Sequence, residues 1–358
     1  MKAVILIGGE GTRLRPLTSN IPKAMVPILN KPFMVHLLGY LKKHGIEDVI
    51  LAMGYLPDPI QSHLGDGTQL GVRLTYLVEN EPLGTAGAVK NAESSLGEPF
   101  LVFNGDILTE IDLSEMIKRH REIKPKVSIA LTPVENPTIY GVVEADKLGM
   151  VQRFVEKPGW EEVTTNMINA GIYILEPEVL ADVSTGKHCM FENYLFPRLL
   201  ARGEPVLSYP SHAYWIDIGT PEKYLKVNHD LLREWGDEVR CEGKSEIHPA
   251  SILEGPALIG NGCVIQGNVR IKGPVVLGAQ CKISRGAVIE GAVLWQETTV
   301  AEKAVLRNCI TGVGSTIEAG CYISEDCVLG DNVTVGKESR MDQGTRVEPD
   351  THLNPEKK

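Results

Sequence analysis

Near the N-terminus, four aliphatic residues, Val4–Ile7, are followed by three glycines and then by two cationic residues. The glycines are Gly8, Gly9 and Gly11. Glycine lets a backbone turn sharply and approach a ligand, and the amide N–H groups of such a turn can converge on an anion. Arg13 and Lys23 add positive charge, and an Arg side chain can hold phosphate oxygens in a fork. This combination predicts a cradle for a polyphosphate.

Two other phosphate-binding glycine motifs do not fit this stretch. A P-loop needs a Lys-Ser or Lys-Thr pair after its glycines, and none follows here. The dinucleotide fingerprint needs a third glycine at the position of Leu14. A tight strand–helix turn with basic surface residues is the plainer alternative, and the carboxylates and loops farther along the chain argue against it.

The stretch resembles the signature of the sugar-1-phosphate nucleotidyltransferases, in which G-G-x-G-T-R-L-x-P-L-T is followed by P-K. Residues Gly8–Thr18 and Pro22-Lys23 match it without a gap, and the resemblance extends over essentially the whole chain. It implies transfer of a nucleoside monophosphate from a nucleoside triphosphate to a sugar 1-phosphate, with GTP and mannose 1-phosphate as the expected pair. The residues that it assigns to the nucleotide site are Leu6, Gly8, Gly9, Gly11, Thr12, Arg13 and Lys23, of which Arg13 and Lys23 are also expected to be catalytic.

Two aspartates lie in apolar surroundings that suit a metal ion. Asp106 follows a buried strand expected over Phe100–Asn104, and Asp217 lies between Ile216 and Ile218. Proteins commonly hold Mg²⁺ through one or two carboxylates together with substrate phosphates. The resemblance implies that Asp106 and Asp217 are catalytic and hold Mg²⁺ as the cofactor. A turn residue and an acid near a helix start are the structural alternatives.

Shorter segments resemble the family's base and sugar contacts. In Leu83–Ala88, Gly84 and Thr85 are expected at the nucleobase, although Thr85 could simply cap a helix. The sugar-phosphate site is implied to contain Gly141, Glu156, Lys157 and Asn169. Among these, Glu156 would hold sugar hydroxyls and Lys157 the sugar phosphate. Glu192 lies near an acidic position of the family, without a firm role.

Strands alternate with helices through the first half of the chain. This order predicts a mostly parallel sheet covered on both sides, and the resemblance implies a Rossmann-like nucleotidyltransferase domain of the α/β class. Strands are expected at 48–53, 72–78, 100–104 and 126–132, and helices at about 31–44, 58–64, 85–95, 113–122, 191–201 and 221–235. Asn30 is expected to cap the first helix. Between Tyr140 and Leu175 the pattern indicates a mixed or antiparallel layer that binds sugar.

A repeat of six residues begins at Ile247. An Ile or Leu recurs every sixth position through Ile289, with a small or β-branched residue four positions after each. The register slips between about Val293 and Thr316 and resumes at Ile317. Such a period predicts a parallel β-helix of roughly five coils, and the resemblance to hexapeptide-repeat proteins implies a left-handed one.

These patterns divide the chain into four segments. A nucleotidyltransferase domain is expected over 1–235, a linker over 236–246, the β-helix over 247–345 and a charged tail over 346–358. The open end of the coils and two aromatic residues, Trp295 and Tyr322, predict a homo-oligomer that forms through or near the β-helix.

Composition excludes several classes of protein. The net charge is −10 and no basic stripe is present, so nucleic acid is an unexpected partner. No apolar run reaches a membrane span and no signal peptide opens the sequence, which predicts a cytoplasmic protein without a membrane partner. The seven cysteines lack C-x-x-C spacing, and Cys263, Cys281, Cys321 and Cys327 fall at small positions of the repeat. They are expected as buried, reduced thiols rather than zinc ligands.

Three alternatives to this function remain open. The same chemistry could use glucose 1-phosphate with dTTP, UTP or ATP. A non-catalytic regulatory or sensor homologue could share the two-domain plan, although Arg13, Lys23, Asp106 and Asp217 are intact. An acyltransferase is disfavoured because the coils contain only His248, at their start, and no long insertion.

Overall fold

The computed structural model describes residues 1–54 and 57–354, and the chain forms two compact units. The first unit comprises Met1–Gly9 and Met34–Asp217, and the second comprises Glu10–Phe33 and Ile218–Lys358. The signature loop after Gly9 therefore groups with the C-terminal repeat in the second unit.

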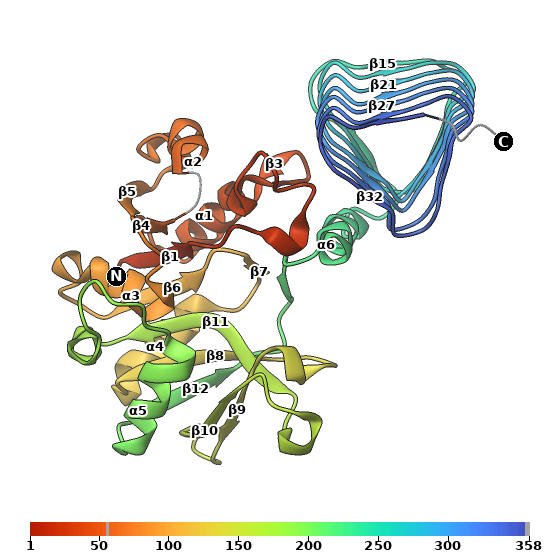
Figure 1. Ribbon diagram of the computed structural model, residues 1–358. Helices are drawn as coiled ribbons and strands as arrows, with labels where there is room; N and C mark the ends of the chain where they lie inside the picture. Colours follow the sequence, from red (N-terminus) through yellow and green to blue (C-terminus); the bar gives the residue numbers. More distant parts are fainter. Residues whose placement is uncertain (55–56, 355–358) are drawn as a thin grey trace. The chain divides into compact units, whose positions relative to one another are not determined.

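The first unit is built on a nine-stranded sheet (Figure 1). Four strands are parallel in the order β6-β1-β4-β5: β1 (Ala3–Ile7), β4 (Asp48–Met53), β5 (Arg73–Val78) and β6 (Phe100–Asn104). The others are β8 (Val127–Pro133), β9 (Gly141–Ala145), β10 (Val151–Glu156), β11 (Met167–Leu175) and β12 (Val206–Pro210). Strand β11 runs antiparallel to β6, β8 and β9, which makes this half of the sheet mixed. The Rossmann-like domain with a mostly parallel sheet is thus confirmed.

Helices pack against this sheet through apolar faces. They are α1 (Phe33–Lys43), α2 (Pro57–Leu64), α3 (Gly84–Asn91), α4 (Leu113–Ile123) and α5 (Phe196–Ala201). Helix α3 contacts β1, α4 contacts β8 and α5 contacts β10. Asp112 caps α4, because its side chain accepts a hydrogen bond from the backbone N–H of Glu115 at 3.0 Å.

The predicted start of the first helix is wrong. Residues Lys31–Pro32 form strand β3, which pairs with β2 (Pro27–Ile28), so α1 begins only at Phe33. Asn30 lies in the left-handed region at φ 62° and caps no helix. Its side-chain amide instead donates to the Glu242 carboxylate and to the carbonyl of Leu277, both at 3.0 Å.

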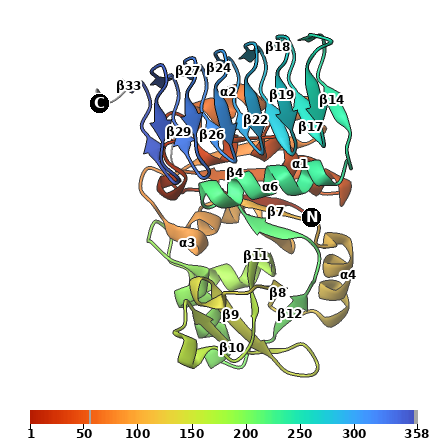
Figure 2. The same ribbon diagram turned by 90° about the vertical axis from the view of Figure 1, so that its right-hand side faces the viewer.

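The second unit contains a triangular coil of short parallel strands (Figures 1 and 2). One face has β14 (Val239–Cys241), β17 (Ala257–Ile259), β20 (Val275–Leu277), β23 (Val293–Leu294), β26 (Ile310–Thr311), β29 (Val328–Leu329) and β32 (Arg346–Val347). The next has β15 (Glu246–Ile247), β18 (Val264–Ile265), β21 (Lys282–Ile283), β24 (Thr299–Val300), β27 (Thr316–Ile317), β30 (Thr334–Val335) and β33 (His352–Leu353). The third has β16 (Ile252–Glu254), β19 (Arg270–Lys272), β22 (Val288–Glu290), β25 (Val305–Arg307), β28 (Tyr322–Ile323) and β31 (Arg340–Met341).

The β-helix is confirmed, but it is longer than the sequence predicts. Its faces hold seven, seven and six strands, so the described residues form nearly seven coils rather than five. The segment 236–246 is not a linker, because β14 pairs with β17 inside it. The expected tail likewise contributes β32 and β33. At the C-terminal end the six-residue spacing continues from Val335 through Met341, Val347 and Leu353, which pack in the interior of the coil.

The slip in the six-residue period has a simple origin. In most coils the paired residues are eighteen positions apart, as in Ile259 and Leu277. Leu294, however, pairs with Leu277, seventeen positions earlier, and Thr311 pairs with Leu294 at the same spacing. Two successive coils each lack one residue in the connection from the third face to the first: Ile289 and Leu294 are five positions apart, whereas Ile271 and Leu277 are six. Buried Thr311 takes an inward position there, and its hydroxyl lies 3.0 Å from that of Thr298.

Small residues line the interior of the coil, as the repeat predicts. Cys263, Cys281, Cys321 and Cys327 are buried there together with Cys309, and all seven cysteines of the chain are unpaired. Burial raises the pKa of the Cys309 thiol. Among residues 1–54 and 57–354, no helix combines the length and apolar character of a membrane span.

The six-residue register leaves Trp295 pointing outward or into the region of the slip, and the structure buries this side chain. It is 3 % exposed, and its indole N–H donates to the hydroxyl of Tyr224 at 2.9 Å. Tyr224 lies on α6 (Pro221–Arg233), which Thr220 caps. The Tyr224 hydroxyl in turn donates to the carbonyl of Pro27, so α6 joins the coil to the signature segment within the second unit.

Candidate active site

Two short strands place the predicted metal-binding aspartates next to each other. Strand β7 (Ile107–Thr109) pairs antiparallel with β13 (Trp215–Asp217), and Asp217 lies opposite Ile107. Asp106 directly precedes Ile107 in the chain, so the two carboxylates belong to adjacent positions of one ribbon. Asp217 is 8 % exposed and Asp106 is half-buried.

A tyrosine supports one of these carboxylates. The hydroxyl of Tyr140 donates to Asp217 Oδ2, and its ring packs edge-on against Trp215 with 5.6 Å between centroids. The Trp215 indole N–H donates to the carbonyl of Ala170 at 3.0 Å. The side chain of Asp217 is therefore oriented by two aromatic residues that the sequence analysis did not assign.

This donor set suits a divalent cation that also binds phosphate. Within the described part of the chain, no group of three or more His, Cys, Asp and Glu side chains could hold a metal by itself. Two carboxylates alone are the usual protein contribution to a Mg²⁺ ion that takes its remaining ligands from substrate phosphates and water. Asp106 and Asp217 fit such an ion.

Close backbone contacts fix the strand ends around Asp106. The N–H of Gly105 donates to the carbonyl of Leu6 at 2.9 Å, and a Cβ at Gly105 would lie 2.6 Å from that oxygen. Only glycine fits there. Asn104 Oδ1 is buried and accepts no hydrogen bond from the described residues. Water or a ligand group must satisfy it, since an unpaired buried oxygen is costly.

The first glycines of the signature border open space. A Cβ added to Gly8 or Gly9 would meet no atom of the described chain within 4 Å, and both residues are exposed. They directly follow β1, whose Leu6 is half-buried. In an open α/β sheet, ligands bind beyond the carboxyl ends of the strands, which is where these residues lie.

In the second unit the rest of the signature folds into a compact loop. Gly11 adopts φ 65°, and a Cβ there would lie 3.2 Å from Lys23 Cβ and 3.3 Å from Thr18 Cγ2. The Thr18 hydroxyl donates to the carbonyl of Gly11 at 2.8 Å. Thr12 and Arg13 are exposed on the short helix η1 (Thr12–Leu14). The loop thus brings Gly11 and Lys23 together and presents Arg13 to solvent.

The β-helix contacts this loop through Arg346 of β32. One of its guanidinium nitrogens lies 3.4 Å from the carbonyl of Arg13 and 3.5 Å from that of Arg15. The other forms an ion pair with Glu222 at 3.2 Å. Asn20 also donates to Asp331 at 3.0 Å. These contacts anchor the loop, and Arg346 falls in the segment that the sequence predicts as a charged tail.

The predicted nucleobase loop is held by the segment before α5. The N–H groups of Ala86 and Gly87 donate to the carbonyl of Cys189 at 2.9 and 3.1 Å. Gly84 adopts φ 71°, and a Cβ there would lie 2.6 Å from the same oxygen. Thr85 does not cap α3, because its hydroxyl donates to Glu192 Oε2 at 2.9 Å and accepts from the N–H of Phe191 at 2.8 Å.

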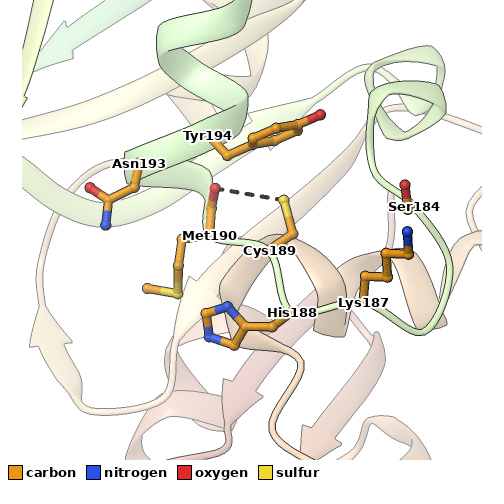
Figure 3. Close-up of a pocket in the computed structure, with 7 residues that line it drawn as sticks. All are labelled: Ser184, Lys187, His188, Cys189, Met190, Asn193 and Tyr194. Atoms are coloured by element: carbon orange, nitrogen blue, oxygen red, sulfur yellow. Dashed lines mark hydrogen bonds between the residues drawn. The ribbon is translucent and has the colours of Figure 1, made fainter.

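The same supporting segment forms one wall of a pocket (Figure 3). Its volume is about 370 Å³. The lining residues are Ser184, Lys187, His188, Cys189, Met190, Asn193 and Tyr194. A Cβ at Gly87 would lie 2.7 Å from the carbonyl of Lys187, so this wall and the start of α3 are in tight contact.

Strands β9 and β10 bring together two of the predicted sugar-binding residues. Gly141 pairs with Glu156, and a Cβ at Gly141 would lie 2.8 Å from Glu156 Oε2. Burial raises the pKa of the Glu156 carboxyl, the charge of Glu192 raises it further, and Lys157 partly opposes both effects. Lys157 Nζ lies 3.8 Å from Glu156 Oε1, and its backbone adopts φ 49°. Non-glycine residues in this region cluster at functional sites.

Both the oxygen and the nitrogen of the Asn169 side-chain amide, on β11, form hydrogen bonds. Its Oδ1 accepts from the N–H of Gly171 at 2.9 Å, and its Nδ2 donates to the hydroxyl of Tyr173 at 2.7 Å. Tyr173 is fully buried and donates to Glu192 Oε1 at 3.2 Å. Glu192 therefore connects Asn169 to Thr85, a link that no short sequence motif contains.

The sequence motifs assign no role to Tyr140, Tyr173 or Arg346 and leave that of Glu192 open. Tyr140 directly precedes Gly141, and Tyr173 follows Asn169 by four positions, so their proximity to predicted site residues was a usable signal. Arg346 gave none, because its partners are 331 and 333 positions away in sequence.

Comparison with protein families matches the two parts of the chain separately. The family described as "Nucleotidyl transferase" matches residues 2–234. The family described as "EIF2B subunit epsilon LbH domain" matches residues 238–341, which agrees with a left-handed β-helix.

Several curated proteins resemble the chain over most of its length. A "Probable mannose-1-phosphate guanylyltransferase 3" from Oryza sativa is 36% identical and covers 91% of each chain. The "Mannose-1-phosphate guanylyltransferase" of Mycobacterium tuberculosis is 36% identical over 76% of this chain and 78% of its own. A "UTP--glucose-1-phosphate uridylyltransferase" from Synechocystis is 34% identical over 89% of this chain and 90% of its own.

Solved structures resemble about two thirds of the chain. The crystal structure of HddC from Yersinia pseudotuberculosis complexed with GMP-PN matches with a TM-score of 0.56 and 34% identity, over 64% of this chain and 99% of that one. The resemblance drawn from the glycine signature is therefore confirmed. Since one family covers residues 2–234 and relatives at 36% identity span 91% of the sequence, the chain belongs to the nucleotidyl transferase family and is a sugar-1-phosphate nucleotidyltransferase.

Proposed function

We propose that the protein transfers the guanylyl group of GTP to mannose 1-phosphate and releases pyrophosphate. The observation that carries this proposal is the pairing of Asp217 with Ile107, next to Asp106, in a chain that has the full glycine signature. The names of the relatives from Mycobacterium and Oryza support the choice of base and sugar.

In the proposed reaction the nucleophile comes from the substrate. An ionised phosphate oxygen of mannose 1-phosphate attacks the α-phosphorus of GTP in line, and the bond from that phosphorus to the β-phosphate oxygen breaks. The electron pair leaves with pyrophosphate, so the protein needs no covalent intermediate. Its contribution is positioning and charge stabilisation.

The proposed roles of the cations follow the charges that must be held. Arg13 and the signature amides would bind the β- and γ-phosphates as they leave. Lys23 would bind the α-phosphate, and Lys157 would bind the phosphate of the sugar. These groups stabilise negative charge without proton transfer, since Lys and Arg are already charged at neutral pH.

Asp106 and Asp217 would hold Mg²⁺. When bound, this ion would screen the repulsion between the two anionic substrates. The Tyr140 hydroxyl keeps one carboxylate oxygen of Asp217 occupied, which restricts the orientation of the other. Leu6, Gly8, Gly9, Gly11 and Thr12 would complete the nucleotide site.

The base and the sugar would be recognised by the remaining loops. Gly84 and Thr85 would contact the nucleobase through a backbone that Cys189 holds in place. Glu156 and Asn169 would bind sugar hydroxyls, and Gly141 would leave room for the ring because it lacks a side chain. These assignments follow the motif resemblance and the hydrogen bonds that hold the loops and strands in place.

A second substrate pair has a specific observation in its favour. The Synechocystis relative, named as a uridylyltransferase for glucose 1-phosphate, is 34% identical over 89% of the chain. Pyrophosphate release should therefore be measured over a grid of GTP, UTP, dTTP and ATP against mannose and glucose 1-phosphates. Highest kcat/KM for GTP with mannose 1-phosphate would support the proposal, whereas a preference for another pair would reassign the substrates. Release from no pair would favour a regulatory role.

We further propose a cytoplasmic homo-oligomer that has neither nucleic acid nor membrane as a partner. The seven unpaired cysteines suit a reducing compartment. Two exposed isoleucines on the first coil, Ile247 and Ile252, support an interface at that end of the β-helix.

A further inference from the structure

A buried carboxylate connects the predicted base loop to the predicted sugar-binding strand. Glu192 is 8 % exposed and lies in a short π-helix, Phe191–Leu195, directly before α5. Single π turns are frequent at functional sites. Its two oxygens have different partners: Oε2 accepts from the Thr85 hydroxyl at 2.9 Å and Oε1 accepts from the Tyr173 hydroxyl at 3.2 Å.

The two hydroxyls that donate to Glu192, those of Thr85 and Tyr173, each accept a further hydrogen bond. Thr85 accepts from the backbone N–H of Phe191 at 2.8 Å, and Tyr173 accepts from Asn169 Nδ2 at 2.7 Å. Asn169 Oδ1 then accepts from the N–H of Gly171. An ionised carboxylate only accepts, so both hydroxyls must point toward Glu192, and the hydrogen bonds on its two sides are both directed toward it.

A network of this kind transmits a change at one end to the other. Tyr173 is fully buried, and a buried donor or acceptor that loses its partner carries the full cost of desolvation. If Thr85 moves away from Glu192, the carboxylate must find another donor or shift its position. Either response alters the hydrogen bond to Tyr173 and hence the orientation of Asn169.

The charge of Glu192 also reaches a second sugar-site residue. It raises the pKa of the Glu156 carboxyl in addition to the effect of burial. Lys157 lies 3.8 Å from Glu156 and opposes this effect. The position of Glu192 therefore influences Glu156 electrostatically and Asn169 through hydrogen bonds.

We infer that Glu192 is a positioning residue that couples nucleotide binding at the Thr85 loop to sugar-phosphate binding at Asn169. The inference rests on the proposed function, because it requires those two loops to contact the two substrates. Bound nucleotide would fix the position of Thr85, and through its hydrogen bond the position of Glu192. Glu192 would in turn fix Tyr173, so that Asn169 would be oriented before the sugar phosphate binds. Coupling between two binding sites is reciprocal, so the sugar phosphate must tighten nucleotide binding by the same factor.

The test measures the factor by which bound nucleotide tightens the binding of mannose 1-phosphate, in the full-length protein with Mg²⁺ present. The dissociation constant of mannose 1-phosphate is determined by calorimetry, alone and with a saturating GTP analogue whose α,β-bridge is methylene and cannot react. In the wild type the analogue should tighten binding severalfold. In Glu192→Gln the ratio of the two constants should fall toward one. Glu178→Gln is the matched control, since Glu178 pairs with Lys126 at the surface of the same unit, and it should keep the wild-type ratio.

Two further variants exclude a merely structural effect. Thr85→Val should weaken mannose 1-phosphate binding in the presence of the analogue, and Tyr173→Phe should weaken analogue binding in the presence of mannose 1-phosphate. The double variant should lose less than the two single losses combined. These variants keep the test decisive if Glu192→Gln fails to fold.

A wild-type ratio in folded Glu192→Gln would overturn the inference. So would a Thr85→Val variant whose defect is confined to the nucleotide, or two single losses that simply add. Failure of the proposed function is distinguishable, because wild-type protein would then show no pyrophosphate release in the substrate grid. Release with an unchanged ratio in Glu192→Gln would leave the function intact and remove only the coupling.

Discussion

At the scale of single residues, the two aspartates at the β7–β13 ribbon carry the greatest predicted effect. Asp106→Asn and Asp217→Asn keep the size of the side chain but remove the negative charge that a divalent cation needs. We expect each variant to lower kcat by about 10²-fold or more, since metal stabilisation of transferring phosphates contributes several kcal/mol. Steady-state assays with Mg²⁺ measure this, and circular dichroism checks that the fold is kept.

Glu110→Gln is the matched control for these two variants. Glu110 is exposed and follows β7 directly, so its substitution removes a carboxylate close to the site while Asp106 and Asp217 stay unchanged. Near-normal Mg²⁺-dependent activity in both aspartate variants would show that neither carboxylate holds the ion.

The two phosphate sites should respond differently to loss of a cation. Arg13→Ala should mainly lower kcat, because Arg13 is proposed to bind the leaving pyrophosphate. Lys157→Ala should mainly raise the KM for the sugar phosphate, by about tenfold, which is the typical effect of one charge-assisted hydrogen bond. Initial rates with each substrate varied separately distinguish the two.

Lys147→Ala serves as the control for Lys157, since Lys147 is an exposed lysine in the turn between β9 and β10. Lys147→Ala should leave kcat and the KM for the sugar phosphate unchanged. If the effects of Arg13 and Lys157 are exchanged, the two phosphate sites have been assigned in the wrong order.

Residue identities could be predicted from the sequence wherever a motif is local. The glycine signature, Glu156-Lys157-Pro158 and Asn169-Ala170-Gly171 each lie within a few positions, so residue types and spacing suffice to propose site residues there. Glu192 could not be placed because its partners, Thr85 and Tyr173, are 107 and 19 positions away. Only the folded β11 and α3 bring those side chains to one carboxylate.

At the scale of elements, helix α4 contributes a buried histidine that ties it to the sheet. His120 Nδ1 lies 2.8 Å from the Ser128 hydroxyl on β8, and Nε2 lies 3.3 Å from Glu176, which follows β11. Burial lowers the pKa of His120 below its ordinary value of 6.5, and Glu176 only partly opposes this. The neutral ring is thus the form that the fold accommodates.

This predicts a pH dependence of the free energy of unfolding. The unfolded chain binds a proton at His120 near pH 6.5, whereas the folded chain does so only at lower pH. The stabilisation is therefore fully present above about pH 6.5 and is lost as the pH falls toward the folded pKa. Urea unfolding between pH 7.5 and 5 should show a steeper loss of stability in the wild type than in His120→Gln.

His63→Gln, at an exposed position of α2, should follow the wild-type pH dependence. Equal slopes for the wild type and His120→Gln would show that His120 titrates alike in the folded and unfolded chains.

Element types were largely predictable, whereas several boundaries were not. Hydrophobic runs and the six-residue period identify strands and coils because burial requires them. The start of α1 was misplaced because Asn30 and Lys31 look like a helix start locally but pair with β2 and the coil. The burial of Trp295 could not be predicted, because α6 supplies Tyr224 as its partner and no periodicity reveals that.

At the scale of the whole molecule, the first coil is the predicted site of self-association. Ile247 on β15 and Ile252 on β16 are 36 % and 45 % exposed. Repeat arrays require a cap or a partner at their ends. We expect light scattering to give at least twice the mass of one chain, and Ile247→Glu with Ile252→Glu to lower it toward that of a monomer.

Leu148→Glu is the matched control, since Leu148 is 78 % exposed in the first unit. It should leave the measured mass unchanged. A wild-type chain that is already monomeric at assay concentration would exclude this role for the first coil. So would an oligomer that withstands both isoleucine substitutions.

Direct observation of the transferred group tests the central claim of guanylyl transfer to mannose 1-phosphate. The protein is incubated with Mg²⁺, GTP and mannose 1-phosphate that carries ¹⁸O in its nonbridging phosphate oxygens, and the products are analysed by mass spectrometry. Attack of the sugar phosphate on the α-phosphorus predicts GDP-mannose that retains all of the label, together with unlabelled pyrophosphate. Absence of a nucleotide sugar, or ¹⁸O in the pyrophosphate, would contradict the proposed reaction.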